Sequence, residues 1–170
     1  MVYWLYNITG DKFLLELGEL LNSQNVNWTD VFTKDNHLYR QHSLHCVNLA
    51  QGFKQPTVYY QQSKDKENLE AAEKAMKTIR NTIGTPIGLW AGDELIRFGD
   101  PIYGSELCTA VEMMYSLETM LEITGNMQWA DQLERIAYNA LPTQISDDFM
   151  TKQYFQQANQ VMVSRHRRNF

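Results

Sequence analysis

The sequence predicts an all-α fold in which helical hairpins form part of an α/α toroid. The first observation behind this prediction is a Thr-Gly-Asp-like turn that recurs three times between helical segments. The second is a difference in polarity, because the segments before these turns are apolar nearly all round, whereas those after them have one apolar face. Inner and outer helices of a toroid would differ in this way.

Length and composition are consistent with one domain, residues 1–170. The chain has 170 residues, of which 44% are hydrophobic, and this content is enough for a buried core. The net charge of −5 argues against nucleic acid as a partner, because nucleic acid favours a basic face. The sequence contains neither a membrane-spanning apolar run nor a signal peptide pattern. Its two cysteines are expected to be free thiols.

The three turns lie at residues 9–11, 63–65 and 124–126, and each is followed by an amphipathic helical pattern. The Asp or Asn of each turn can cap the new helix by accepting from its free backbone N–H groups. The apolar positions after the three turns are Leu14, Leu17 and Leu21; Leu69, Ala72, Met76, Ile79 and Ile83; and Trp129, Leu133, Ile136, Ala137 and Ala140.

The segments before the second and third turns, 42–53 and 105–121, are predicted to be inner helices, and the charged segment 66–84 an outer one. The helical pattern ends at Pro142. Residues 149–163 are rich in Gln and are expected to be extended or irregular. Residues 164–170 form a basic run that carries no capping signal.

Asp93 and Glu94 form an acidic pair in a glycine-rich loop beside Trp90. A carboxylic acid next to apolar surface can keep its proton at neutral pH and act as a general acid. Adjacent carboxylates in a loop are also commonly exposed to water without a catalytic role. The residues alone leave both interpretations open.

Glu106 and Cys108 are separated by one residue, and on a helix they would point about 200° apart. In an extended turn or at a frayed helix start, both could reach one metal ion, and a carboxylate with a thiolate suits zinc. If Ser105 is the N-cap, Cys108 lies in the first turn, where the helix dipole favours a thiolate. The alternative is a helix-start glutamate and a buried cysteine. His45 is likewise either a core histidine or a ligand-binding one.

Three motifs occur in order along the chain: residues 45–51 (HCVNLAQ), 92–94 (GDE) and 105–108 (SELC). They are followed by 121–125 (LEITG), 133–141 (LERIAYNAL) and 155–160 (FQQANQ). Together these motifs resemble glycoside hydrolase family 127, the β-L-arabinofuranosidase family. The similarity covers most of the chain, and the Glu-x-Cys motif followed by the LERIAYN helix is its most specific part.

The resemblance implies an (α/α)6-barrel catalytic domain followed by β-sandwich domains. Family members retain the anomeric configuration with a cysteine nucleophile held on zinc, a relative of the two-carboxylate mechanism. Their zinc is bound by a Glu-x-Cys motif and by two adjacent cysteines further along. By resemblance, Glu106 and Cys108 are half of the zinc site, Glu94 is the acid/base with Asp93 as the alternative, and His45 contacts the sugar.

The chain departs from the family pattern because it contains no Cys-Cys pair. We therefore expect residues 1–170 to be an internal part of a larger barrel, truncated at both ends, that is inactive alone and binds zinc weakly or not at all. Its carbohydrate substrate would be an L-arabinofuranoside or a related plant sugar. Uncovered inner helices would favour self-association. The alternative function is a non-catalytic helical scaffold or carbohydrate-binding module of the same fold.

Overall fold

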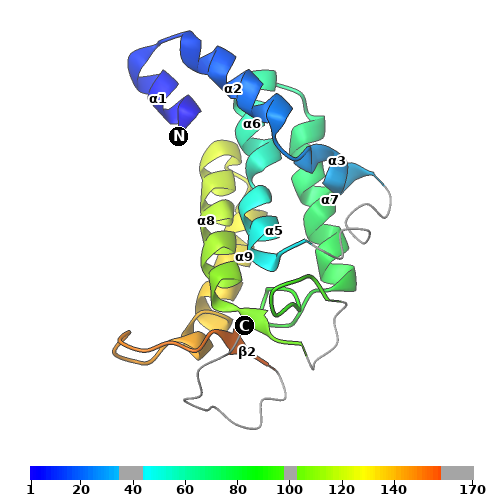
Figure 1. Ribbon diagram of the computed structural model, residues 1–170, viewed down its shortest axis with the longest axis vertical. Coiled ribbons are helices and arrows are strands. Elements are labelled where there is room, and N and C mark those ends of the chain that lie inside the picture. The colour runs from blue at the N-terminus through cyan, green and yellow to red at the C-terminus, as the bar shows by residue number, and fades with distance from the viewer. Residues whose placement is uncertain (35–43, 98–102, 158–170) are drawn as a thin grey trace.

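The computed structural model describes residues 1–34, 44–97 and 103–157, and these are mainly helical (Figure 1). The elements are α1 (Val2–Thr9), α2 (Phe13–Gln24), α3 (Trp28–Thr33), α5 (Cys46–Gly52), α6 (Gln55–Ser63), α7 (Glu67–Thr82), β1 (Ser105–Glu106), α8 (Leu107–Thr124), α9 (Met127–Asn139), η1 (Pro142–Gln144) and β2 (Phe155–Gln156). The prediction of an all-α fold is confirmed, since the strands form only a two-residue antiparallel pair.

All three predicted turns end one helix and precede the next. The helices α1, α6 and α8 end at residues in the left-handed region, with φ values of 71° at Gly10, 57° at Lys64 and 67° at Gly125. In each case the backbone N–H of that residue donates to the carbonyl oxygen four residues earlier. This left-handed residue directs the chain away from the helix axis and allows a hairpin to form.

The predicted cap is confirmed at Asn126, the N-cap residue of α9, whereas Asp11 and Asp65 lie one residue before the N-cap residues Lys12 and Lys66. The side-chain oxygens of Asp11, Asp65 and Asn126 each accept a hydrogen bond from the backbone N–H two residues later. The hydroxyl groups of Thr9, Ser63 and Thr124 in turn accept from the backbone N–H of that acid or amide. The same pair of local hydrogen bonds therefore marks each helix-to-helix turn.

The helices pack in hairpins around a shared apolar core. Helix α8 packs against α9 on one side and against α5 and α6 on the other, while α7 packs against α3 and α6 (Figure 1). Helices α5 and α6 are separated by a break before Pro56, which lies in the first turn of α6. A Cβ atom on Gly52 would lie 2.1 Å from the Trp28 ring, so this glycine allows α3 to pack closely on α5.

Most apolar positions predicted from the turns lie in this core. The buried members are Ala72, Met76, Ile79, Ile83, Trp129, Ile136 and Ala140. The N-terminal hairpin differs, because Leu14 is buried while Leu21 is 50% exposed. Trp4 and Phe13 are also exposed there, so α1 and α2 keep much of their apolar surface in contact with solvent.

Three boundaries differ from the predictions. The short helix α3 was not predicted, and the helix predicted over 42–53 begins only at Cys46. The N-cap residue of helix α8 is Glu106 and not Ser105, the residue that the sequence analysis considered, although Cys108 still lies in the first turn. Ser105 instead lies in β1, where its hydroxyl donates to the backbone carbonyl of Trp90 at 2.8 Å.

The C-terminal arm, residues 141–157, crosses back to the start of α8. Its strand β2 pairs antiparallel with β1, with Ser105 opposite Gln156 and Glu106 opposite Phe155. The rest of residues 149–157 is irregular, as predicted. The remainder of the predicted segment 149–163 and the basic run 164–170 lie outside the described residues. Within the described ranges, no helix has both the length and the apolarity needed to cross a bilayer.

Candidate functional site

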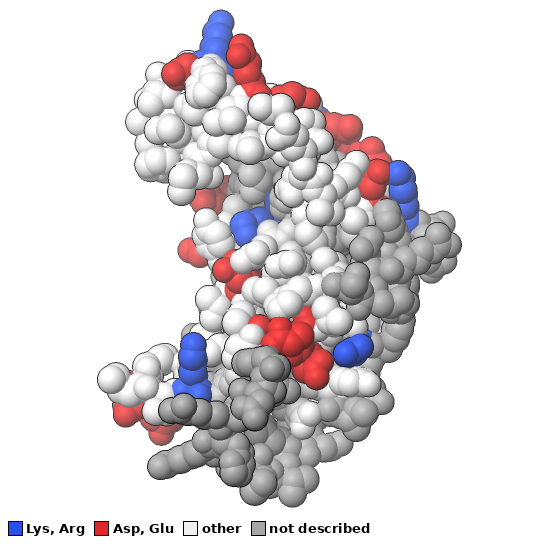
Figure 2. All heavy atoms as spheres, viewed as in Figure 1, with Lys and Arg blue, Asp and Glu red and all other residues white. Residues whose placement is uncertain are grey.

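Three segments that are distant in the sequence meet at one end of the helices. We call this region the corner and define it as His45, the loop 90–97 and residues 104–108. The backbone N–H of Cys46 donates to the carbonyl of Glu94 at 2.7 Å, and that of Gly92 donates to Gly104 at 2.7 Å. Acidic side chains gather on the visible face over this end of the molecule (Figure 2). The corner therefore brings together residues from all three predicted site motifs.

His45 lies at the N-terminus of α5 and uses both of its ring nitrogens within the protein. Its Nδ1 accepts from the backbone N–H of Val47 at 3.3 Å, so His45 caps the helix through its side chain. Its Nε2 lies 2.7 Å from Oε2 of Glu94. Because Nδ1 is an acceptor, the neutral tautomer consistent with both contacts carries its proton on Nε2 and donates it to Glu94.

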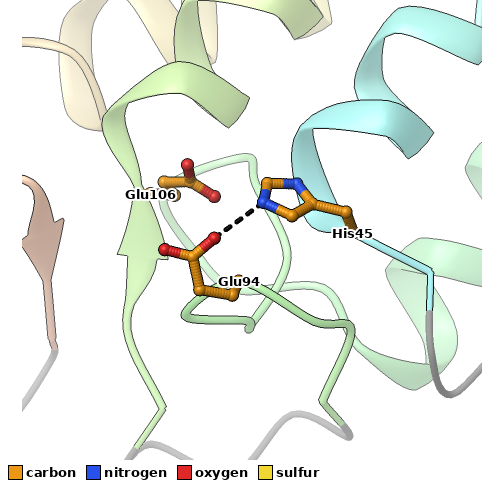
Figure 3. Close-up of side chains that lie close together, drawn as sticks. All are labelled: His45, Glu94 and Glu106. Carbon is orange, nitrogen blue, oxygen red and sulfur yellow. Dashed lines mark hydrogen bonds and ion pairs between the residues drawn. The ribbon is translucent and has the colours of Figure 1, made fainter. Parts of the chain in front are cut away.

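Glu106 faces the same space as His45 and Glu94. The side chains of the three residues converge (Figure 3), and one ligand atom from each lies within 4.8 Å of the other two. Glu106 is only 1% exposed. Its Oε1 accepts from the Tyr154 hydroxyl at 2.7 Å, whereas its Oε2 is buried and accepts no hydrogen bond among the described residues. A buried carboxylate oxygen without a donor is costly, and a cation would satisfy it.

Cys108 lies in the first turn of α8, one residue beyond the end of β1. Its thiol is half-buried, and burial followed by the neighbouring Glu106 carboxylate raises the pKa of Cys108. The chain changes from extended to helical between Glu106 and Leu107. The side chains of Glu106 and Cys108 are therefore neighbours and do not lie on opposite sides of one helix. An extended residue at a helix start is the arrangement in which the sequence analysis expected Glu106 and Cys108 to be able to reach one metal ion.

Asp93 lies outside this group. Its Oδ1 is 3.7 Å from Nε of Arg97, and both side chains are more than a third exposed. Gly92, the residue before Asp93, packs against Sγ of Cys46. Of the two predicted acids, the structure brings only Glu94 together with His45 and Glu106.

Tyr154 is a site residue that the sequence analysis missed. It lies in the C-terminal arm, immediately before β2, and reaches Glu106 only because β2 pairs with β1. Burial, followed by the carboxylate of Glu106, raises the pKa of the Tyr154 hydroxyl well above its usual range. The hydroxyl therefore stays protonated and remains a hydrogen-bond donor to the carboxylate. No local motif in the sequence marks this tyrosine.

Two side chains at the corner carry atoms of the kinds that zinc binds. Glu106 supplies a buried carboxylate oxygen without a donor, and Cys108 supplies a sulfur atom beside it. Carboxylate and thiolate are both zinc ligands, and zinc takes four ligands in structural sites. Glu94 and His45 form a hydrogen-bonded pair that converges with Glu106, whereas Cys108 is not one of the three residues whose ligand atoms lie within 4.8 Å of one another.

Comparison with known proteins identifies the family of this chain. A family model described as "Beta-L-arabinofuranosidase, GH127 catalytic domain" matches residues 1–169. No curated protein matches the chain.

Proposed function

Because the chain belongs to the glycoside hydrolase family 127 catalytic-domain family, we propose that it supplies the acid/base side of a β-L-arabinofuranosidase active site. The catalytic domain of this family is an α/α barrel, and in this proposal the helical hairpins of the chain form part of such a barrel. The observation that carries the proposal is the convergence of His45, Glu94 and Glu106 at the end of the helices. The substrate would be an L-arabinofuranoside or a related plant sugar.

In this proposal Glu94 is the acid/base and Asp93 is not. The Glu94 side chain is 36% exposed, so one of its oxygens can meet a substrate while Oε2 accepts from His45. Glu94 would donate its proton to the glycosidic oxygen as the bond to the anomeric carbon breaks. It would then take a proton from the water that completes hydrolysis. His45 orients the carboxylate, and its predicted contact with the sugar remains a prediction.

Glu106 and Cys108 would hold zinc in the complete site. When bound, zinc stabilises sulfur ligands as thiolates, the form that acts as a nucleophile in a retaining reaction. The chain contains neither the adjacent cysteine pair of the family pattern nor any cysteine besides Cys46 and Cys108. We therefore propose that residues 1–170 belong to a larger barrel, that the isolated chain is inactive, and that its zinc is weakly held.

The decisive experiment assays a longer protein that includes this chain and the cysteine pair, with an aryl β-L-arabinofuranoside as substrate. Glu94→Gln should lower kcat by about 10²-fold or more, since general acid catalysis contributes that much. Asp93→Asn is the matched control and should leave kcat within a factor of about three. Loss of activity in Asp93→Asn but not in Glu94→Gln would reverse the assignment. No hydrolysis by the longer protein would favour the non-catalytic scaffold or carbohydrate-binding alternative.

The isolated chain tests the proposed incompleteness. We expect no release of the aryl group at any concentration of the chain. Hydrolysis that is abolished by Glu94→Gln would show that the chain is sufficient by itself. Metal analysis after gel filtration should find less than one zinc per chain. Stoichiometric zinc that is lost in Cys108→Ser would contradict weak binding by a single chain.

We also propose that the isolated chain associates with a second copy through α8. On the exposed side of this helix, Val111 is 50% exposed and Tyr115 is 57% exposed. Sedimentation velocity should show a mass that rises with concentration, and Tyr115→Glu should reduce it. Tyr138→Glu, on the exposed side of α9, is the matched control. Equal effects of the two substitutions would contradict a role for the α8 surface.

A further inference from the structure

A buried cluster of polar side chains joins the C-terminal arm to the corner, and no step of the proposed reaction uses it. Gln144 is 1% exposed and Gln156 is 8% exposed. Burying an amide costs free energy unless its donors and acceptor find partners, so each of these side chains needs a specific arrangement around it. The partners of Gln144 are at the site itself.

The side-chain amide of Gln144 is bonded to two backbone segments. Its Nε2 donates to the carbonyl oxygen of Ser105 at 3.0 Å and to that of Tyr154 at 3.2 Å. Both partners are acceptors, so only the NH₂ group of the amide can face them. Ser105 directly precedes Glu106, and Tyr154 donates its hydroxyl to Glu106. One side chain thus holds the backbones that carry both partners of that hydrogen bond.

The orientation of the Gln144 amide is itself fixed. Its oxygen accepts from Nε2 of Gln156 at 2.9 Å, and the same nitrogen donates to the carbonyl of Ala140 at 2.9 Å. The oxygen of Gln156 in turn accepts from the hydroxyl of Thr143. Rotation of the Gln144 amide would break several buried hydrogen bonds at once, and such connected networks favour a single arrangement.

The strands that Gln144 joins need this support. β1 and β2 pair over only two residues each, and the backbone N–H of Leu107 adds one more bond to the carbonyl of Tyr154, at 3.0 Å. A ladder this short is marginally stable without packing or side-chain bonds. The same Tyr154 carbonyl accepts from Gln144, so the side chain strengthens the ladder at the residue that contacts Glu106.

We infer that Gln144 is a positioning residue that holds the Glu106 carboxylate and the Tyr154 hydroxyl against each other, beside Cys108. The hydrogen-bond partners of the Gln144 side chain are Ser105, Tyr154 and Gln156, and not His45 or Glu94. It acts through the backbones of Ser105 and Tyr154. The inference concerns the geometry of the corner, and its link to catalysis rests on the proposed function.

The test compares the rate of Cys108 alkylation by iodoacetamide in wild type and Gln144→Met, with each site identified by peptide mass mapping. Cys46 is 0% exposed, so Cys108 is the thiol that the reagent reaches in the folded protein. Methionine has a similar length but no N–H donor, so the strand pair should open more often. We expect the rate constant to rise about fivefold or more, as the loss of one or two buried hydrogen bonds predicts.

The matched control is Gln132→Met. Gln132 is 3% exposed and also makes two side-chain hydrogen bonds, with Gly88 and Arg80, neither of which is in the corner. Both variants should lose stability in urea, but only Gln144→Met should expose Cys108. If the alkylation rates of the two variants rise equally, Gln144 has a merely structural role and the inference is wrong.

A second measurement requires no variant that could fail to fold. Both side-chain N–H protons of Gln144 are bonded to carbonyls, so in wild type they should exchange with solvent at least about tenfold more slowly than those of the exposed Gln24. Equal exchange of the two side chains in NMR spectra would overturn the inference.

Cobalt titration then separates this inference from the proposed zinc role. A sulfur-to-cobalt absorption band that is absent in Cys108→Ser would support Cys108 as a ligand. Gln144→Met should weaken cobalt binding by about tenfold or more, as loss of an outer partner of a ligand typically does, while Gln132→Met should not. If wild type shows no such band, the metal role proposed for Cys108 fails, and the alkylation comparison still decides the role of Gln144. If the band appears but Gln144→Met binds cobalt as tightly as wild type, the inference is wrong.

Discussion

The helices and the corner are stabilised by different kinds of interaction. The shared core of α5, α7, α8 and α9 consists of apolar side chains such as Leu49, Leu117 and Ile136, all 0% exposed. The corner instead buries polar groups, among them Glu106 and Gln144, whose partners come from distant segments. Apolar packing depends mainly on volume, whereas each polar contact depends on a particular donor and acceptor. Substitutions should therefore affect global stability in the helices and local geometry at the corner.

The largest effect on stability is expected in the apolar core. Leu117→Ala removes a fully buried side chain of α8 and should lower the free energy of unfolding by about 2–5 kcal/mol. Val111→Ala, on the exposed side of the same helix, should change it by no more than about 0.5 kcal/mol. Urea denaturation measures both. Similar losses in the two variants would show that α8 is not packed as described.

Gly92→Ala tests the close packing between the corner and α5. An added Cβ would lie 2.1 Å from Sγ of Cys46 and 2.6 Å from the carbonyl oxygen of Leu95. We expect a loss of about 1–3 kcal/mol from overpacking. In a Cys46→Ala background, Gly92→Ala should cost less stability than in wild type, because the contact with Sγ is gone. Part of the cost should persist, because the contact with Leu95 remains. A Gly92→Ala variant as stable as wild type would contradict the packing.

Tyr154→Phe tests a single polar contact at the corner. It leaves the buried Glu106 carboxylate without its Oε1 partner, and we expect a loss of about 1–2 kcal/mol in urea denaturation. Tyr138→Phe, at a tyrosine that is 77% exposed on α9, is the control and should have almost no effect. An equal stability of the two variants would mean that the Tyr154 hydroxyl does not stabilise Glu106.

The smallest effect concerns the pH dependence of stability at Cys46. Burial raises the pKa of this thiol from 9.0 to about 12 in the folded protein. The unfolded chain therefore releases the proton at lower pH, and the contribution of Cys46 is fully present below pH 9 and decreases as the pH rises toward 12. Between pH 8 and 10 the free energy of unfolding should fall by about 1 kcal/mol more in wild type than in Cys46→Ala. Parallel pH profiles would contradict the burial of the thiol.

The sequence predicted the helices better than the corner for a physical reason. Helix periodicity and the capped turns are local, so Leu117, Ile136 and the turn at Gly125 could be placed from neighbouring residues alone. The pairing of His45 with Glu94 and the contact of Tyr154 with Glu106 join residues that are far apart in the sequence. The family resemblance drew attention to His45, Glu94, Glu106 and Cys108. It did not indicate Tyr154 or Gln144, whose roles depend on how β2 pairs with β1.

The three capped turns have a consequence for the order of folding. Each turn carries its own stop and start signals within a few residues, so each helix boundary can form before any tertiary contact. The hydrogen bonds of the corner close long loops, and such contacts form slowly because chain entropy opposes them. We therefore expect the hairpins to form early and the corner to assemble last, when the arm that carries Tyr154 reaches the start of α8.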